Sequence, residues 1–295
     1  MTAKIFILSI LLAMPVDVYA AEAEIPPVPP PVIDIELPAI FTDTQPIPLP
    51  PVVAKPAESN QPPAEILPYQ MEVGSSYSKL SNGFADWSSY YVNAEMKLAG
   101  RNNIYGSMRQ ENRHSKNDTE LMGGFYEPID SNFTAVIEGS MSPEHHFLPS
   151  RTFLGEVEYS GPSGWAGEVG MRHVEYNLAE LNVLLLNAER SWSNYRVAYT
   201  RFQGFLLGRG STNSSQVQAA KYYGDHNWYG ITVSNGTELE TLPDSQVLSS
   251  HVRAIVFSGL HWLKPRFGLA YAIGNYHQGN FYIRNGIQLG LRQQF

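Results

Sequence analysis

Apolar and polar residues alternate with a period of two from Tyr69 to the C-terminus, in segments of about ten residues. In "YYVNAEMKL", one face carries Tyr90, Val92, Ala94, Met96 and Leu98, and the other carries Tyr91, Asn93, Glu95 and Lys97. The last segment, "RNGIQLGLRQQF", sets Ile287, Leu289, Leu291 and Phe295 against Arg284, Gln288 and Arg292. Because successive side chains of a strand point to opposite faces, this pattern predicts β-strands with one apolar and one polar face.

The number and spacing of these segments favour a closed antiparallel sheet. About 14 strands fit between Tyr69 and Phe295, with 12 as the alternative count. Short connections such as "SWSN" alternate with longer polar ones such as "GFLLGRGSTNSS", and aromatic residues, including Trp87, gather near the breaks. Membrane barrels place short turns on the periplasmic side, longer loops outside and aromatic girdles at both interfaces. The sequence therefore predicts an all-β transmembrane barrel whose last strand pairs with its first, leaving no unpaired edge in lipid.

The first 68 residues differ from the strand region. Residues 1–20 contain Lys4, an apolar run and then small residues, which is typical of a secretory signal peptide. Together with Pro15, the region up to Pro68 holds 15 of the chain's 21 prolines, and proline supplies no backbone donor for regular structure. We therefore expect a signal peptide over 1–20, a disordered, extended Pro-rich periplasmic arm over 21–68 and a barrel over 69–295. The arm is interpreted as a spacer, a partner-binding segment or a plug.

Composition supports a location in the outer membrane of a Gram-negative envelope. Charged residues make up 16% of the chain, below the share of about 25% typical of soluble domains, and aromatic residues make up 12%. The net charge of −8 argues against a nucleic-acid partner, and the absence of cysteine excludes disulfides and a lipid-modified cysteine. We expect outer-membrane lipid and lipopolysaccharide as partners, together with a periplasmic partner of the arm. Leu289, Leu291 and Phe295 resemble the C-terminal signal read by the barrel-assembly machinery.

If the apolar faces meet lipid, the charged faces line the lumen. The predicted lumen-lining charges are Glu95, Lys97, Arg109, Glu111, Glu138, Glu156, Glu158, Glu168, Arg172, Arg196, Arg253, Arg266, Arg284 and Arg292. Acidic residues predominate in the first half and arginines in the second, which predicts an acidic wall facing a basic one. Two interpretations remain open: a hydrated passage that selects polar or charged solutes, and a lumen closed by salt bridges.

No catalytic residues, cofactor or metal site are predicted. Ser249 and His251 share a strand face, which leaves an outer-membrane lipid hydrolase as an alternative, but no third member of a triad is evident. Asp225 and His226 fall in a short turn where no cleft is expected. The "EHH" of residues 144–146 lacks a third converging ligand for a metal.

Three stretches resemble the YaiO family of outer-membrane β-barrels: "LSNGFADW", "FLPSRTFLGEVEY" and the C-terminal "SSHVRAIVFSGLHWLKPRFGLAYAIGNYHQGNFYIRNGIQLGLRQQF". The resemblance covers about Glu72 to Phe295 and implies an outer-membrane barrel, in a family where some members are linked to surface polysaccharide. It implies no catalytic residues. Our expectation is a non-enzymatic channel or surface barrel for polysaccharide or polar solutes, with a closed structural or adhesion barrel as the alternative.

Overall fold

A computed structural model describes most of the region read as strands. The described residues are 69–98, 102–113, 116–177, 179–206, 210–224, 227–241 and 247–295. The predicted signal peptide, the Pro-rich arm and the Asp225-His226 pair lie outside them. In the described part of the chain, no helix is long and apolar enough to cross a membrane.

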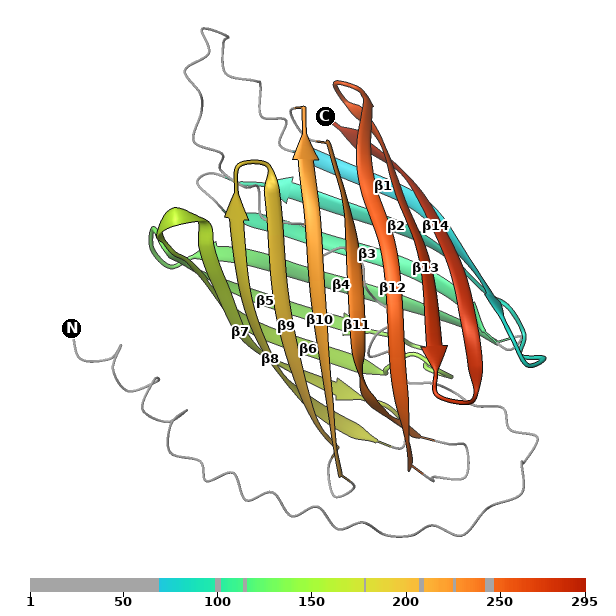
Figure 1. Cartoon of the computed structure of the whole chain (residues 1–295). Helices are drawn as coiled ribbons and strands as arrows, with labels where there is room; N and C mark the ends of the chain where they lie inside the picture. The colour runs from blue at the N-terminus through green and yellow to red at the C-terminus, as the bar shows by residue number, and fades with distance from the viewer. Residues whose placement is uncertain are drawn as a thin grey trace, which may run out of the picture. The chain divides into compact units, whose positions relative to one another are not determined.

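The described residues form one closed antiparallel barrel of 14 strands (Figure 1). The strands are β1 (Tyr69–Leu80), β2 (Trp87–Lys97), β3 (Asn103–Arg113), β4 (Lys116–Pro128), β5 (Phe133–Met141), β6 (Arg151–Ser160), β7 (Trp165–Glu175), β8 (Glu180–Trp192), β9 (Tyr195–Leu206), β10 (Gly210–Tyr223), β11 (Asn227–Thr241), β12 (Val247–Lys264), β13 (Phe267–Gln278) and β14 (Tyr282–Gln294). Each strand pairs with its neighbours in sequence, and β14 pairs with β1. The predicted fold and the count of 14 are confirmed, and the alternative of 12 is wrong.

The two faces of the barrel follow the period-two pattern. On β14, Ile287, Leu289 and Leu291 point outward and are 44–49% exposed, whereas Arg284 on the opposite face is 7% exposed. Direct cross-strand partners share a face, as Ile287 does with Tyr77 of β1 and Ile273 of β13. The outer surface is therefore apolar around the ring, and the polar positions turn inward.

Both chain ends of the barrel lie on one side, here called the terminus side, and the opposite side is called the loop side. The terminus side carries the turns of residues 129–132, 161–164, 193–194 and 265–266. The longest described connection, residues 142–150, is on the loop side. The "GFLLGRGSTNSS" stretch, expected to be a longer connection, is partly strand, because β9 extends to Leu206 and β10 begins at Gly210; β12 is 18 residues long. In these strands, cross-strand pairing continues beyond the number of residues expected for a membrane-spanning strand.

Exposed aromatic side chains form a belt around the terminus side. Its members are Tyr69, Phe133, Tyr159, Trp165, Trp192, Tyr195, Tyr223, Tyr229 and Phe295. Several pack as pairs, including Trp192 with Tyr195 and Phe133 with Tyr159. Such a belt is typical of the level at which a membrane barrel meets lipid headgroups.

The terminal phenylalanine belongs to the seam that closes the barrel. Phe295 and Tyr69 exchange two backbone hydrogen bonds of 3.0 and 3.1 Å, and their rings stack with centroids 6.0 Å apart. From there β1 and β14 stay paired through Leu80 and Arg284, and Figure 1 shows the two strands side by side. Leu289, Leu291 and Phe295 all face outward. Their role as an assembly signal stays a prediction.

Inside the seam, one tyrosine spans three strands. The Tyr91 side chain of β2 lies over Gly74 of β1 and Gly290 of β14. A Cβ atom at either glycine would fall within 2.5 Å of the Tyr91 ring or its hydroxyl oxygen. The Tyr91 hydroxyl donates to Glu72 Oε1 (2.8 Å), and Arg292 Nε donates to Glu72 Oε2 (2.6 Å). The two glycines are therefore required by this close approach, and the buried carboxylate links β2, β1 and β14.

We predict that Gly74→Ala destabilises the barrel. The new methyl group would lie 2.4 Å from the Tyr91 ring and 2.6 Å from the carbonyl oxygen of Leu289, and the backbone cannot move aside without disturbing closure. The free energy of unfolding should fall by about 1–3 kcal/mol, as for other overpacked sites. Urea unfolding of the refolded protein in lipid vesicles, followed by tryptophan fluorescence, measures the change.

Gly155→Ala is the matched control, because a Cβ atom at Gly155 would meet nothing within 4 Å. Its effect should stay within about 0.5 kcal/mol. Equal unfolding midpoints for the two variants would contradict the proposed packing of Tyr91 on the seam.

Candidate functional site

The inner wall of the barrel is the candidate site, since most of the predicted lumen charges lie at inward strand positions. These are Glu95, Lys97, Arg109, Glu111, Glu138, Glu156, Glu158, Glu168, Arg172, Arg196, Arg284 and Arg292. Many retain accessible surface, as Glu156, Glu158 and Glu168 do. The strand alternation thus delivers these groups to one shared interior.

Two arginines predicted to line the lumen do not. Arg253 lies on the outward face of β12 with Ile255 and Phe257, and it is exposed. Around Arg253, both faces of β12 carry apolar residues: Val252 and its inward neighbours are buried, and Ile255 and Phe257 are exposed on the outer face. The polarity pattern therefore did not indicate which face Arg253 occupies. Arg266 lies in the turn between β12 and β13 and belongs to neither wall.

Sequence reasoning also missed charged residues that the structure places on the inner wall. They are Glu72, Arg113, Asp118, Glu120 and Glu189. The same alternation would have found them, because each shares a face with a charged or polar neighbour two positions along its strand. Asp118 and Arg113 are 0% and 1% exposed and are among the most deeply buried side chains described.

The charges do not form an acidic wall opposite a basic one, so that expectation was wrong. Acidic residues concentrate on β5 to β8, where Glu158 and Glu168 are direct cross-strand partners. The inward positions of β10 and of the described part of β13 carry no charged side chain. Four of the inward arginines are neutralised close to their own strands, and the wall opposite the acidic residues is largely neutral.

Four ion pairs account for this local neutralisation. Arg109 Nη2 lies 2.8 Å from Glu120 Oε2, Arg113 Nε 2.7 Å from Glu111 Oε1, and Arg292 Nε 2.6 Å from Glu72 Oε2. Arg196 forms the fourth pair with Glu189 of the adjacent strand. Each joins residues on the same strand or on neighbouring strands, because the register sets them side by side.

The connection of residues 142–150 packs against the inner wall on the loop side. Asp118 of β4 accepts hydrogen bonds from the backbone N–H groups of Phe147 (2.8 Å) and Leu148 (2.9 Å) and bonds to His146 Nδ1 (2.7 Å). Phe147 and Leu148 are 4% and 1% exposed. A single buried carboxylate thus satisfies consecutive backbone donors and holds the segment in place.

Aromatic rings and arginines surround this inward segment. The Arg113 guanidinium lies 4.2 Å from the Trp87 ring centroid and 5.0 Å from that of Phe147. Arg284 lies 4.0 Å from the Tyr276 centroid and 5.0 Å from that of Trp87. Trp87, expected in an outer girdle, therefore faces inward. These stacks narrow the loop side of the lumen.

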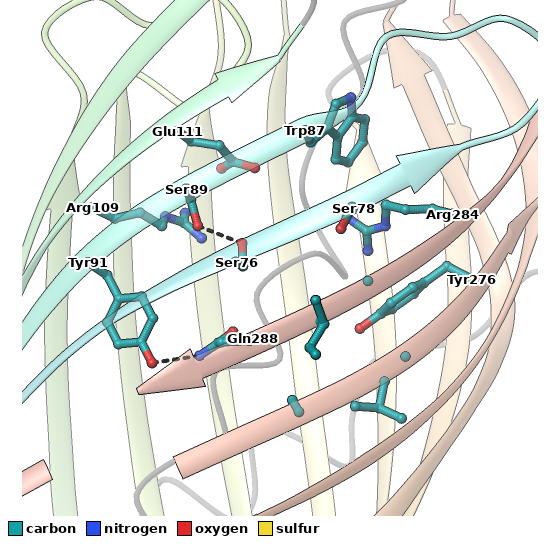
Figure 2. Close-up of a pocket in the computed structure, with 15 residues that line it drawn as sticks. Ser76, Ser78, Trp87, Ser89, Tyr91, Arg109, Glu111, Tyr276, Arg284 and Gln288 are labelled. Atoms are coloured by element: carbon teal, nitrogen blue, oxygen red, sulfur yellow. Dashed lines mark hydrogen bonds between the residues drawn. The ribbon is translucent and has the colours of Figure 1, made fainter. Parts of the chain in front are cut away.

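A cavity lined by Trp87, Tyr276 and Arg284 of these stacks and by polar side chains of the seam lies against the closing strands (Figure 2). Ser76 and Ser89 share a hydrogen bond of 2.7 Å between their hydroxyls, and Gln288 Nε2 donates to the Tyr91 hydroxyl at 3.1 Å. Figure 2 shows these side chains lying between the adjoining strands of the seam. Hydroxyl and amide groups beside aromatic rings can bind a hydroxyl-rich solute through hydrogen bonds and ring contacts.

His251 and Glu144 belong to the hydrolase and metal-binding alternatives considered from the sequence, and each has few polar partners among the described residues. His251 lies at an outward position and accepts a hydrogen bond from Arg253 Nε at 3.2 Å. Glu144 accepts from the backbone N–H of Thr119 at 3.1 Å, within the inward segment. Across the described ranges, no group of three His, Asp or Glu side chains is arranged to hold a metal ion.

Comparison with known proteins agrees with the geometry. The fold and its apolar outer surface define an outer-membrane β-barrel. The YaiO membrane beta barrel domain matches residues 69–241, which is more than half of the chain, and the protein belongs to this family. No curated protein matches the chain.

Solved structures share the fold at low sequence identity. An anion-selective porin from Comamonas acidovorans is 12% identical with a TM-score of 0.45, covering 77% of this chain and 98% of the porin. A bacterial polysaccharide outer membrane secretin is 7% identical with a TM-score of 0.50, over 77% and 98% of the two chains. Omp33 of Acinetobacter baumannii is 9% identical with a TM-score of 0.47, over 78% and 99%. At these identities the likeness concerns the fold alone.

We predict that Asp118→Ala releases residues 142–150 from the wall. The change leaves the N–H groups of Phe147 and Leu148 without their acceptor, at a cost of about 1–3 kcal/mol for each unsatisfied donor. Proteinase K should then cleave this segment at least about tenfold faster, because cleavage follows the population of the open form. The cleavage rate is measured on refolded protein, with the site located by mass spectrometry.

Asp130→Ala is the matched control, since Asp130 accepts bonds from the backbone N–H groups of Asn132 and Phe133 in a terminus-side turn. It should leave cleavage within 142–150 unchanged. Equal protection of that segment in the wild type and the Asp118→Ala variant would show that the carboxylate does not anchor it.

Proposed function

We propose that this protein is a non-enzymatic, water-filled outer-membrane passage for small polar solutes, with a preference for cations and neutral, hydroxyl-rich molecules. The observation that carries the proposal is the acidic group Glu156, Glu158 and Glu168 on the inner wall of β6 and β7, which retains accessible surface inside the barrel. By the loop rule for outer-membrane barrels, the loop side faces the exterior and the terminus side faces the periplasm.

Water inside the barrel is favoured by the acidic residues themselves. Glu158 and Glu168 face each other across adjacent strands, and two like charges at such a distance are destabilising unless water or cations screen them. An apolar, tightly packed interior would not accommodate this pair. Charged groups that line a hydrated pore favour counter-ions, so the acidic wall supports preferential entry of cations.

The cavity at the seam supports the proposed passage of hydroxyl-rich solutes. The cavity at the seam presents hydroxyls from Ser76 and Ser89, the amide of Gln288 and the ring of Tyr276. A saccharide unit offers hydroxyl groups that can bond to the serine hydroxyls and the Gln288 amide. It also offers an apolar ring face that can pack on Tyr276. A link to polysaccharide passage is part of this proposal.

A closed barrel with a structural or adhesive role is the alternative. It is favoured by the inward segment at residues 142–150 and by the apolar cluster of Val174, Leu181, Val183 and Leu206 on the inner wall at the loop side. Both occupy space at the mouth. In that case the ion pairs would stabilise a filled interior, and the loop side would do the binding.

Two partners are proposed alongside the passage. The barrel-assembly machinery would read Leu289, Leu291 and Phe295 before β14 closes on β1, since all three face outward. A periplasmic protein would bind the Pro-rich arm, whose predicted extended form suits peptide recognition.

We predict stable single-channel conductance with a preference for potassium over chloride. The full chain, refolded and inserted into a planar bilayer, is measured across a potassium chloride gradient, where the reversal potential gives the permeability ratio. Replacing the facing pair in Glu158→Gln/Glu168→Gln removes both carboxyl groups from the wall, and we expect the ratio to fall about twofold or more. The same measurement without residues 22–68 tests the plug interpretation of the arm.

Glu127→Gln is the control variant, because Glu127 lies near the terminus-side end of β4 but faces outward and is exposed. It should leave the permeability ratio unchanged. If neither the full chain nor the chain without residues 22–68 conducts, although both are well folded, the passage would be refuted and the closed barrel supported.

A further inference from the structure

A row of polar residues crosses the outer surface where a membrane barrel is expected to be apolar. His277 of β13 pairs with Arg253 of β12, Arg253 with Asn235 of β11, Asn235 with Ser215 of β10, and Ser215 with Arg201 of β9. Since direct partners share a face, all five point outward. Together they form a continuous line across five neighbouring strands.

A second polar row lies directly toward the loop side, and on β9 to β12 an apolar row lies directly toward the terminus side. We call the two polar rows the outer polar patch; it consists of Arg201, Gln203, Asn213, Ser215, Asn235, Thr237, His251, Arg253 and His277. The apolar row includes Val217, Val233 and Ile255, each 46–48% exposed. The patch therefore adjoins the apolar band on its loop side, where lipid headgroups are expected, and on β9 the exposed Phe205 lies beyond it toward the loop.

The arginines of the patch have no carboxylate partner among the described residues. Arg201 Nη1 donates to the Ser215 hydroxyl at 2.9 Å, and Arg253 Nε donates to His251 Nε2 at 3.2 Å. None of the nine patch residues is acidic. In the lumen, by contrast, Arg109, Arg113, Arg196 and Arg292 each pair with a glutamate. Arg201 and Arg253 are thus available to an external anion.

We propose that the outer polar patch binds the phosphorylated headgroup of lipopolysaccharide in the outer leaflet. Arginine forms charge-assisted hydrogen bonds with phosphate oxygens, and the apolar band beneath meets acyl chains. The first row spans four strand spacings, or about 19 Å. Phosphates held along this row would engage Arg253 and Arg201 at separate points.

A second copy of this chain fits the patch less well. A two-fold interface would place the same surface of one barrel against that of the other, and the arginines would then face like charges. No acidic residue within the patch would neutralise them. Charge complementarity therefore selects an anionic lipid over self-association.

The test measures the affinity of the full chain in neutral detergent micelles for added diphosphoryl lipid A, read from the change in tryptophan fluorescence. The variant Arg201→Gln/Arg253→Gln should bind about 25-fold more weakly, since each basic residue near an anionic lipid surface contributes about fivefold. Added salt should weaken binding of the wild type more than binding of the variant.

Arg190→Gln is the matched control. Arg190 is also exposed and outward, but it lies on the terminus side of β8 over the Trp165 ring. Its substitution should change the affinity for lipid A by less than about twofold. Circular dichroism and heat-dependent gel mobility establish that both variants fold.

Two results would overturn the proposal. One is equal affinity of the wild type and the double variant for lipid A. The other is an equal loss in Arg190→Gln, which would show a general effect of surface charge. A change in sedimentation of the double variant with unchanged lipid affinity would assign the patch to self-association instead.

Discussion

The structure depends on the requirement that every backbone donor and acceptor of a strand in lipid finds a partner within the protein. An open sheet leaves two unpaired edges, and neither can be satisfied by hydrocarbon. Here β14 returns to β1 and pairs with it from Gln70 to Leu80. Closure also fixes the register of every strand, so it decides which residues face lipid and which face the interior. The placement of Tyr91 over Gly74 and Gly290 shows how tightly that seam is packed.

The same register gives the two surfaces different electrostatic character. Inside, arginines and glutamates are set on the same or adjacent strands and neutralise one another locally, as Arg292 and Glu72 do. The excess carboxylates remain on β5 to β8, where they give the lumen its negative side. Outside, Arg201 and Arg253 lie among neutral residues. The lumen therefore attracts cations, and the outer polar patch attracts anions.

The loop side adds an element that no strand pattern contains. Residues 142–150 turn inward because Asp118 offers a buried acceptor to their backbone, while Arg113 stacks on Phe147. The result is a mouth lined by aromatic rings and paired charges rather than an open ring of strand ends. Whether the barrel conducts therefore depends on how much of the mouth this segment fills.

Residue alternation and spacing were enough to predict the strands, a count of about 14, the closure of the last strand on the first and the inward position of most lumen charges. A period of two is a local property, and in β14 it is strong enough to assign both faces. It did not assign the face of Arg253, because β12 is apolar on both sides in that stretch. It also did not reveal that Trp87 turns inward or that Asp118 holds a loop 28 to 30 residues away. Those outcomes depend on register and on contacts between distant strands, which are fixed only when the whole sheet has closed.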